Sequence, residues 1–170
     1  MIEAAPTLFK ITEIDIVYRS PTKPSERPRI TNSRDSHLIF QAAWDDNKLD
    51  LCEQVMIMLL DRGNRALGVS LISTGGISGA IIDRRMIFAT ALKARACGIV
   101  LAHNHPSGMT RPSPADIKAT KVVSEAGKIL EIPLLDHLII ARDQYYSFAD
   151  EGLVLWTLPK RKEHLISKTF

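Results

Sequence analysis

The sequence predicts an α/β fold, and two observations support this. Short apolar runs rich in branched residues, typical of buried strands, alternate with longer segments whose apolar residues recur at helical spacing. In the central part of the chain the order is strand, helix, strand, loop, helix, strand, which is the order of an α/β domain. Because 170 residues can bury one good core, we expect one domain with an extension at each end.

The chain is predicted to begin with an extension over residues 1–30. Residues 8–18 alternate apolar and polar side chains, which predicts a strand. Residues 19–34 combine prolines with Lys and Arg, and this basic loop is either solvated surface or a contact for an anion or nucleic acid. We expect the domain itself over 31–157 and a basic C-terminal tail over 158–170.

The first half of the domain is predicted to hold a helix and a β-hairpin. The helix is expected over 36–44. Two apolar runs, 55–60 and 66–72, flank a short polar turn and predict the hairpin. Glu53 stands two residues before Val55 and therefore on the same strand face, where periodicity alone indicates a solvated charge at the strand end.

The second half of the domain is predicted to alternate helix and strand. Asp83 can cap a helix whose apolar residues recur from Ile87 onward. The run 98–102 is short, continuously apolar and rich in branched residues, which predicts a buried strand. Further strands are expected over 134–140 and 145–148.

Two histidines directly follow the predicted buried strand. Residues two apart on a strand point to the same face and lie roughly 6.6 to 7 Å apart along the chain. The side chains of His103 and His105 can therefore converge on one metal ion. A lone histidine at a strand end is usually structural, but a pair on one face followed by a suitable carboxylate indicates a metal site.

That carboxylate is Asp116. A proline-bounded loop after His105 leads to Ser113, which stands at the N-cap position of a predicted helix with Pro114 as its first residue. Asp116 then lies in the first helical turn, where it can be a third ligand and leave a fourth tetrahedral position for water, as in catalytic zinc sites. Ser113 and Asp116 also form a variant of the capping box, and the two roles do not exclude each other.

A second polar pair lies on the strand predicted over 134–140. Asp136 or His137 could support the metal ligands from behind. A histidine within a strand is more often a hydrogen-bonded polar group without such a role. The residues alone leave both interpretations open.

Composition excludes several classes of protein. Cys52 and Cys97 lie far apart and form no CxxC pair, so we expect neither a disulfide framework nor a thiolate zinc site. No apolar stretch reaches the ~18 to 20 residues of a membrane span, and the first residues lack the pattern of a signal peptide, so we expect a cytoplasmic protein without membrane contact. The net charge of +3 permits nucleic-acid contact without arguing for it.

The block from about residue 53 to 153 resembles the RadC family, a bacterial branch of the JAB/MPN domains that carry the JAMM metalloprotease signature. The matching residues are 101–108, Pro112, Ser113, Asp116, Asp136, His137 and 147–149. The resemblance implies a mixed sheet of the cytidine-deaminase-like type flanked by helices. It also implies one zinc ion held by the positions that match His103, His105 and Asp116.

The resemblance further implies a zinc-dependent metallopeptidase or isopeptidase-like hydrolase, with a peptide or isopeptide as substrate. In JAMM enzymes the zinc activates a water and polarises the substrate carbonyl, while the serine that matches Ser113 helps to stabilise the oxyanion. An upstream glutamate at the start of a strand serves as general base, and the matching residue here is Glu53, followed by Asp61 and Asn64.

An alternative is a metal-binding but catalytically weak or inactive interaction module. The family name comes from an association with DNA repair, so DNA or DNA-repair proteins are expected partners of such a module, reached through the basic residues 23–34 and the tail. The residues before 31 hold a strand and a basic loop in place of the helix-hairpin-helix region of many RadC proteins, which weakens the expectation of DNA binding. Imidazole and carboxylate ligands suit zinc but also iron, nickel or manganese.

Overall fold

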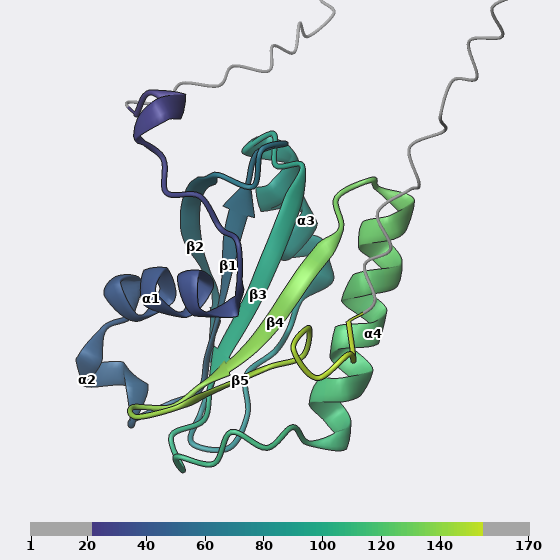
Figure 1. Ribbon diagram of the computed structural model, residues 1–170. Helices are drawn as coiled ribbons and strands as arrows, with labels where there is room; N and C mark the ends of the chain where they lie inside the picture. The colour runs from purple at the N-terminus through teal and green to yellow at the C-terminus, as the bar shows by residue number, and fades with distance from the viewer. Residues whose placement is uncertain (1–21, 155–170) are drawn as a thin grey trace, which may run out of the picture.

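The computed structural model describes residues 22–154 as a mixed α/β domain. The strand predicted over 8–18 and the tail from 158 lie outside these residues. One five-stranded sheet has the order β2-β1-β3-β4-β5 (Figure 1). The α/β prediction is therefore confirmed. The strands are β1 (Gln54–Leu60), β2 (Ala66–Thr74), β3 (Gly98–Asn104), β4 (Leu134–Ile140) and β5 (Tyr145–Ser147).

Strand direction within the sheet is mixed. β1 pairs antiparallel with both β2 and β3, and β4 pairs antiparallel with β5. β3 and β4 are parallel. A parallel pair needs a crossover connection, and here the chain crosses through the helix α4 (Pro114–Ile129). This crossover begins at the carboxyl end of β3, where His103 and His105 lie, and leads through α4 to the start of β4.

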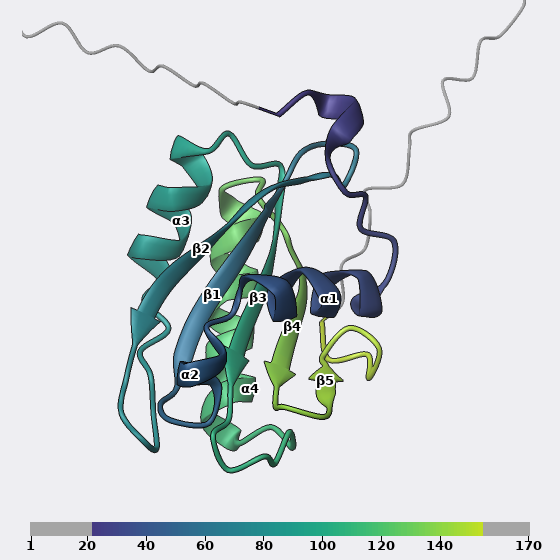
Figure 2. The same cartoon turned by 90° about the vertical axis from the view of Figure 1, so that its left-hand side faces the viewer.

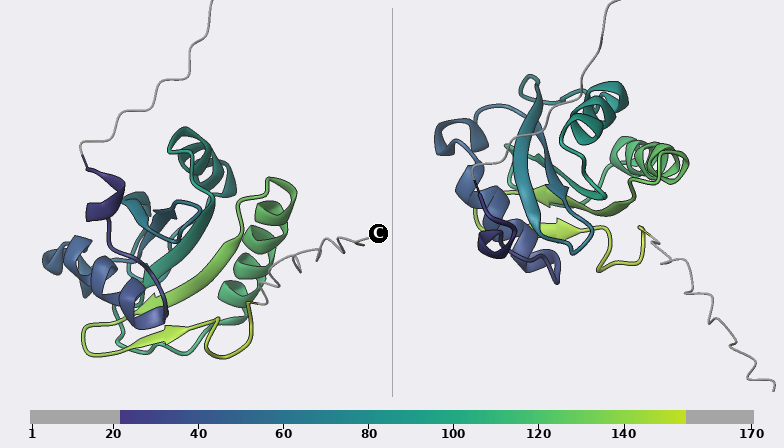
Figure 3. Two further views of the ribbon diagram at one scale, coloured as in Figure 1. Left: turned by 45° about the horizontal axis from the view of Figure 1, so that its top comes forward. Right: turned by 90° about the horizontal axis from the view of Figure 1, so that it is seen from above.

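Helices cover both faces of the sheet. The helix α3 (Arg84–Lys93) lies with α4 on one face, and α1 (Ser33–Ala43) lies with the short α2 (Asp46–Leu49) on the other (Figures 1 and 2). Seen from above, the sheet separates the two helical layers (Figure 3). Every residue of β1 and β3 is buried, which explains why these strands read as continuous apolar runs.

The core is divided by the sheet into two clusters. Along β1, alternate side chains enter alternate clusters: Val55, Ile57 and Leu59 face α3 and α4, whereas Met56 and Met58 face α1 and α2. No helix within residues 22–154 is long and apolar enough to cross a membrane.

Local capping explains most helix starts. Asp83 accepts a hydrogen bond from the backbone N–H of Arg85, and Ser113 accepts one from Asp116, so both predicted caps are confirmed. The helix predicted over 36–44 begins earlier, at Ser33, because the side chain of Asn32 caps it through the N–H of Asp35. Two further elements, α2 and a single 3-10 turn at Pro24–Glu26, were not predicted, because both are too short to show a periodic pattern.

Candidate metal centre

The two histidines meet at the carboxyl end of β3. His103 is only 3% exposed, whereas His105 follows the strand and is half-buried. Their Nε2 atoms lie 3.0 Å apart. The intervening Asn104 points to the opposite face of the sheet, as the alternation of strand side chains requires. The structure therefore brings the predicted histidine pair together on one face.

Asp116 completes a three-residue group. Its Oδ1 atom lies 3.3 Å from Nε2 of His103, and its Oδ2 atom lies 3.8 Å from Nε2 of His105. One ligand atom from each of the three residues can be chosen so that all lie within 4.8 Å of one another. For metal–ligand distances of 2.0 to 2.1 Å, two ligands of a tetrahedral ion are about 3.3 Å apart, close to these spacings. The group could therefore hold a metal ion.

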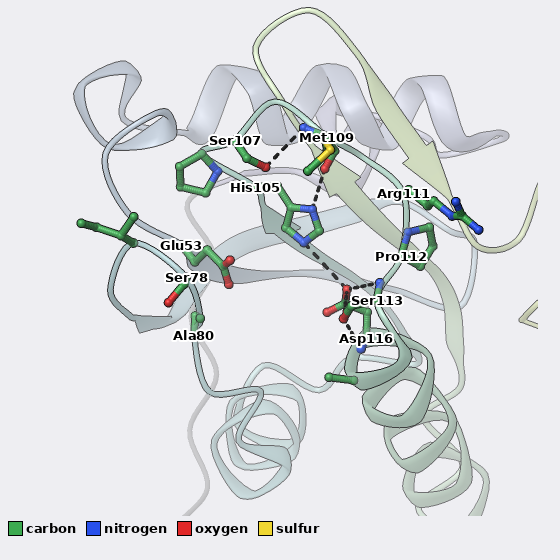
Figure 4. Close-up of a pocket in the computed structure, with 14 residues that line it drawn as sticks. Glu53, Ser78, Ala80, His105, Ser107, Met109, Arg111, Pro112, Ser113 and Asp116 are labelled. Carbon is green, nitrogen blue, oxygen red and sulfur yellow. Dashed lines mark hydrogen bonds and ion pairs between the residues drawn. The ribbon is translucent and has the colours of Figure 1, made fainter.

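Asp116 is also held by its helix cap. Its Oδ2 atom accepts hydrogen bonds from the backbone N–H and the hydroxyl of Ser113, at 2.8 and 2.6 Å. Burial alone would raise the pKa of Asp116, but its contacts with His103 and Ser113 outweigh burial and place this pKa below the usual range. The carboxylate is thus ionised, and the capping box orients it toward His105 (Figure 4) and toward His103.

A chain of hydrogen bonds decides which nitrogen of His103 carries a proton. The carbonyl oxygen of Asp116 can only accept, so the Thr120 hydroxyl donates to it at 2.6 Å. Thr120 Oγ1 must then accept from Nδ1 of His137, also at 2.6 Å. Burial lowers the pKa of His137 well below its usual value, so this ring is neutral and its Nε2 accepts from Nδ1 of His103 at 2.8 Å. In the neutral ring of His103, Nε2 then has a free lone pair.

In His105 a single hydrogen bond fixes the position of the ring proton. Its Nδ1 atom lies 2.6 Å from the carbonyl oxygen of Met109, which can only accept, so Nδ1 carries the proton. When both rings are neutral, the lone pairs of the two Nε2 atoms face each other beside the Asp116 carboxylate. That arrangement is repulsive unless a proton or a metal ion lies between the three groups. Two imidazole nitrogens and one carboxylate are ligands that suit zinc and other first-row metal ions.

Glu53 lies across a cavity from Asp116. The antiparallel register pairs Val55 with His103, and continuing this register by two residues places Glu53 opposite His105. Glu53, His105, Ser113 and Asp116 all line one cavity of about 560 Å³. Figure 4 shows the Glu53 carboxylate on the cavity wall that faces His105 and Asp116, two members of the candidate metal group His103, His105 and Asp116. The pairing of β1 with β3 therefore joins residues some fifty positions apart, which spacing along the chain could not predict.

The rest of the cavity wall is mainly apolar, and its two most exposed apolar residues had no signal in the sequence. The segment between β2 and α3 supplies Ile77, which is 82% exposed, and the loop after β3 supplies Met109, which is 69% exposed. Both side chains line the cavity and are exposed, so they can contact a bound molecule. Other apolar residues of the wall are Ala80, Pro106, Pro112 and Ala115.

The polar pair on β4 divides between the two faces of the sheet. His137 backs the candidate metal ligand His103 through the hydrogen bond described above. Asp136 instead accepts hydrogen bonds from the Ser147 hydroxyl at 2.7 Å and from the backbone N–H of Ala149 at 2.9 Å. Burial raises the pKa of Asp136 to about 6, against the effect of these bonds. Both cysteines are free thiols, as expected.

Comparison with known proteins gives one family. The model of the RadC-like JAB domain matches residues 30–153. A UPF0758 protein from Flavobacterium johnsoniae is 41% identical over 125 residues, which are 74% of this chain and 53% of that protein. A UPF0758 protein from Porphyromonas gingivalis is 40% identical over 131 residues, covering 76% of this chain and 57% of its own length. The chain thus spans about half the length of the curated relatives it matches.

Proposed function

The chain belongs to the RadC-like JAB domain family, and we propose that it is a zinc-dependent hydrolase that cleaves peptide or isopeptide bonds. The observation that carries this proposal is the convergence of the Nε2 atoms of His103 and His105 on the Asp116 carboxylate. This group opens onto a cavity that also holds a carboxylate and a hydroxyl outside the ligand set. A structural metal site would need neither group.

The proposed roles divide between holding the ion and moving protons. His103, His105 and Asp116 would hold the zinc ion. When bound, zinc supplies Lewis acidity, which lowers the pKa of water and polarises a carbonyl oxygen.

Glu53 is the proposed general base. Its carboxylate would take a proton from the attacking water and later deliver it to the leaving amine. A correctly placed base contributes about 10² to 10⁴ in rate. The position of Glu53 in the cavity wall supports this role, because the proton must pass between groups that line the same cavity.

Ser113 is the proposed oxyanion helper. Its hydroxyl now donates to Oδ2 of Asp116 at 2.6 Å, while its backbone N–H donates to the same oxygen at 2.8 Å. If the hydroxyl turned toward a substrate oxygen, the backbone N–H would still hold Asp116. Ser113 can therefore change partner without releasing the ligand that it orients.

A cationic cluster at the opposite end of the sheet supports the second candidate, an inactive metal-binding module that contacts DNA. Arg29 forms an isolated bridge with Arg65, and Arg62 lies in the same turn between β1 and β2. Arg29 and Arg62 are exposed. Such side chains suit the phosphate backbone of DNA. This candidate predicts DNA binding that weakens with salt and is unchanged by His103→Ala.

A library of peptides and isopeptides tests the proposed hydrolase directly. The wild type should cleave some members, His103→Ala should lose both zinc and turnover, and Glu53→Gln should keep zinc while turnover falls by about 10² to 10⁴. Glu125→Gln, an exposed change on α4 away from the cavity, is the matched control and should behave as wild type. Zinc-loaded wild type that cleaves no member would overturn the hydrolase proposal in favour of the second candidate.

A further inference from the structure

We propose that Asn104, the residue between the two histidines, is a positioning residue that holds Glu53 beside the metal group. This inference rests on the proposed role of Glu53 as general base. Asn104 is fully buried and points away from the cavity, so it touches neither the metal group nor a substrate there. Its side chain instead contacts the backbone on both sides of Glu53.

The contacts of Asn104 enclose the Glu53 position. Its Oδ1 atom accepts a hydrogen bond from the backbone N–H of Gln54 at 2.7 Å. Its Nδ2 atom donates to the carbonyl oxygen of Cys52 at 2.9 Å and to that of Leu49 at 2.6 Å. The residues directly before and after Glu53 are therefore attached to the strand that carries the histidines. One buried amide uses both of its donor hydrogens and its acceptor for this purpose.

Glu53 depends on these backbone contacts. None of the hydrogen bonds and ion pairs found within residues 22–154 involves the Glu53 carboxylate, so no side-chain interaction holds it toward His105 and Asp116. Its own backbone N–H donates to the carbonyl oxygen of Gly76 at 2.8 Å, and its carbonyl oxygen accepts from Gly75 at 2.8 Å. These two bonds join Glu53 to the segment that follows β2. The side chain of Asn104 joins its two neighbours, Cys52 and Gln54, to the end of β3.

An asparagine suits this place for a geometric reason. The end of β3 carries His103 and His105 on one face, and the residue between them must point to the other face. On that face lie two carbonyl oxygens that need donors and one N–H that needs an acceptor. An aspartate would accept from Gln54 but would set a negative oxygen against the carbonyl oxygens of Leu49 and Cys52. A short apolar side chain would leave all three buried groups unpaired.

The test combines Asn104→Ala with Glu53→Gln and the corresponding double variant, all loaded with zinc. Met58→Ala is the structural control, because Met58 is fully buried in β1 on the same sheet face as Asn104 but away from Glu53. Asn104→Ser replaces Asn104→Ala if the latter does not fold. Three quantities are measured for each variant: zinc affinity by chelator competition, hydrogen exchange of the Glu53 and Gln54 amides, and kcat with KM on a cleaved substrate.

Asn104→Ala should leave zinc affinity within about threefold of wild type, because its ligands are unchanged, and should raise exchange at the Glu53 and Gln54 amides by about tenfold or more. Its kcat should fall by about 10- to 100-fold with little change in KM, the effect of a base displaced by about an ångström. The double variant should lose no more kcat than Glu53→Gln alone, because both changes remove the same contribution. Met58→Ala should lower the melting temperature without these effects.

Additive kcat losses in the double variant, or zinc loss in Asn104→Ala comparable with that in His103→Ala, would overturn the inference. If the wild type cleaves nothing, the hydrolase proposal fails, and positioning is then judged without turnover. Hydrogen exchange and the visible absorption spectrum of the Co²⁺-loaded protein serve that purpose. Asn104→Ala should reproduce the spectral change of Glu53→Gln, and an unchanged spectrum with unchanged exchange would contradict the positioning role.

Discussion

The Nδ1 atom of His103 lies 2.8 Å from Nε2 of His137, so a candidate metal ligand on β3 is backed by a neutral histidine on the neighbouring strand β4. This contact keeps the proton of His103 on Nδ1 and leaves Nε2 free to bind. A hydrogen bond of this kind behind a metal-binding histidine fixes the ring and raises its basicity. The pair therefore links the packing of the sheet to the chemistry of the candidate centre.

Replacement of His137 by phenylalanine should weaken zinc binding. The aromatic volume and the stacking on Phe148, with ring centroids 4.7 Å apart, are kept, but His103 Nδ1 loses its acceptor. We expect a 10- to 100-fold rise in the zinc dissociation constant, measured by competition with a chromophoric chelator. His37→Phe is the control, because His37 stacks on Tyr145 away from the metal group. Equal affinities in wild type and His137→Phe would show that the backing histidine has no influence.

Thr120 should matter through its hydroxyl alone. It is only 2% exposed, and its hydroxyl pairs both the carbonyl oxygen of Asp116 and Nδ1 of His137. Thr120→Val keeps the shape and the helical bond of its own N–H to the Asp116 carbonyl, but it leaves Nδ1 of His137 without its acceptor, which should lower the free energy of unfolding by about 1 to 3 kcal/mol. Thr120→Ser keeps the hydroxyl and should lose less. Urea denaturation of the metal-free proteins measures the difference, and equal losses in the two variants would argue against the proton chain.

Asp136 should make stability fall as pH rises through the mildly acidic range. Burial raises its pKa to about 6 in the folded protein, whereas an unfolded aspartate titrates near 3.9. Between about pH 4 and 6 the folded state holds the extra proton, so the free energy of unfolding decreases with rising pH, by on the order of 2 to 3 kcal/mol in total. Above pH 6 the loss is complete.

Asp136→Asn removes this titration while keeping an oxygen for the backbone N–H groups of His137 and Ala149. The difference in unfolding free energy between variant and wild type should grow in favour of the variant from pH 4 to 6 and then stay constant. Denaturant titrations at several pH values measure it. A difference that is constant over that range would mean that Asp136 titrates normally.

The strands, the helix cap and the histidine pair could be predicted because each is encoded by residues close together in the chain. β1 and β3 are covered on both faces and so appear as unbroken apolar runs, and Ser113 caps α4 within three residues of Asp116. His103 and His105 share a face because strand side chains alternate. Each of these features depends on neighbours in the chain, so spacing was enough to predict it.

The features that were left open depend on which strands pair. Glu53 faces the centre because β1 runs antiparallel to β3, and His137 reaches His103 because β4 lies parallel beside β3. The three hydrogen bonds of Asn104 likewise join segments some fifty residues apart. Strand order and register are properties of the whole sheet, and no local pattern around Glu53, Asn104 or His137 contains them.

The most direct test of the central claim is the metal content of the chain purified without chelators. Elemental analysis of the wild type should find about one zinc or other first-row metal ion per chain, held by His103, His105 and Asp116. The double variant His103→Ala/His105→Ala should retain only background metal while remaining folded. A wild type that carries no more metal than this double variant would contradict the account.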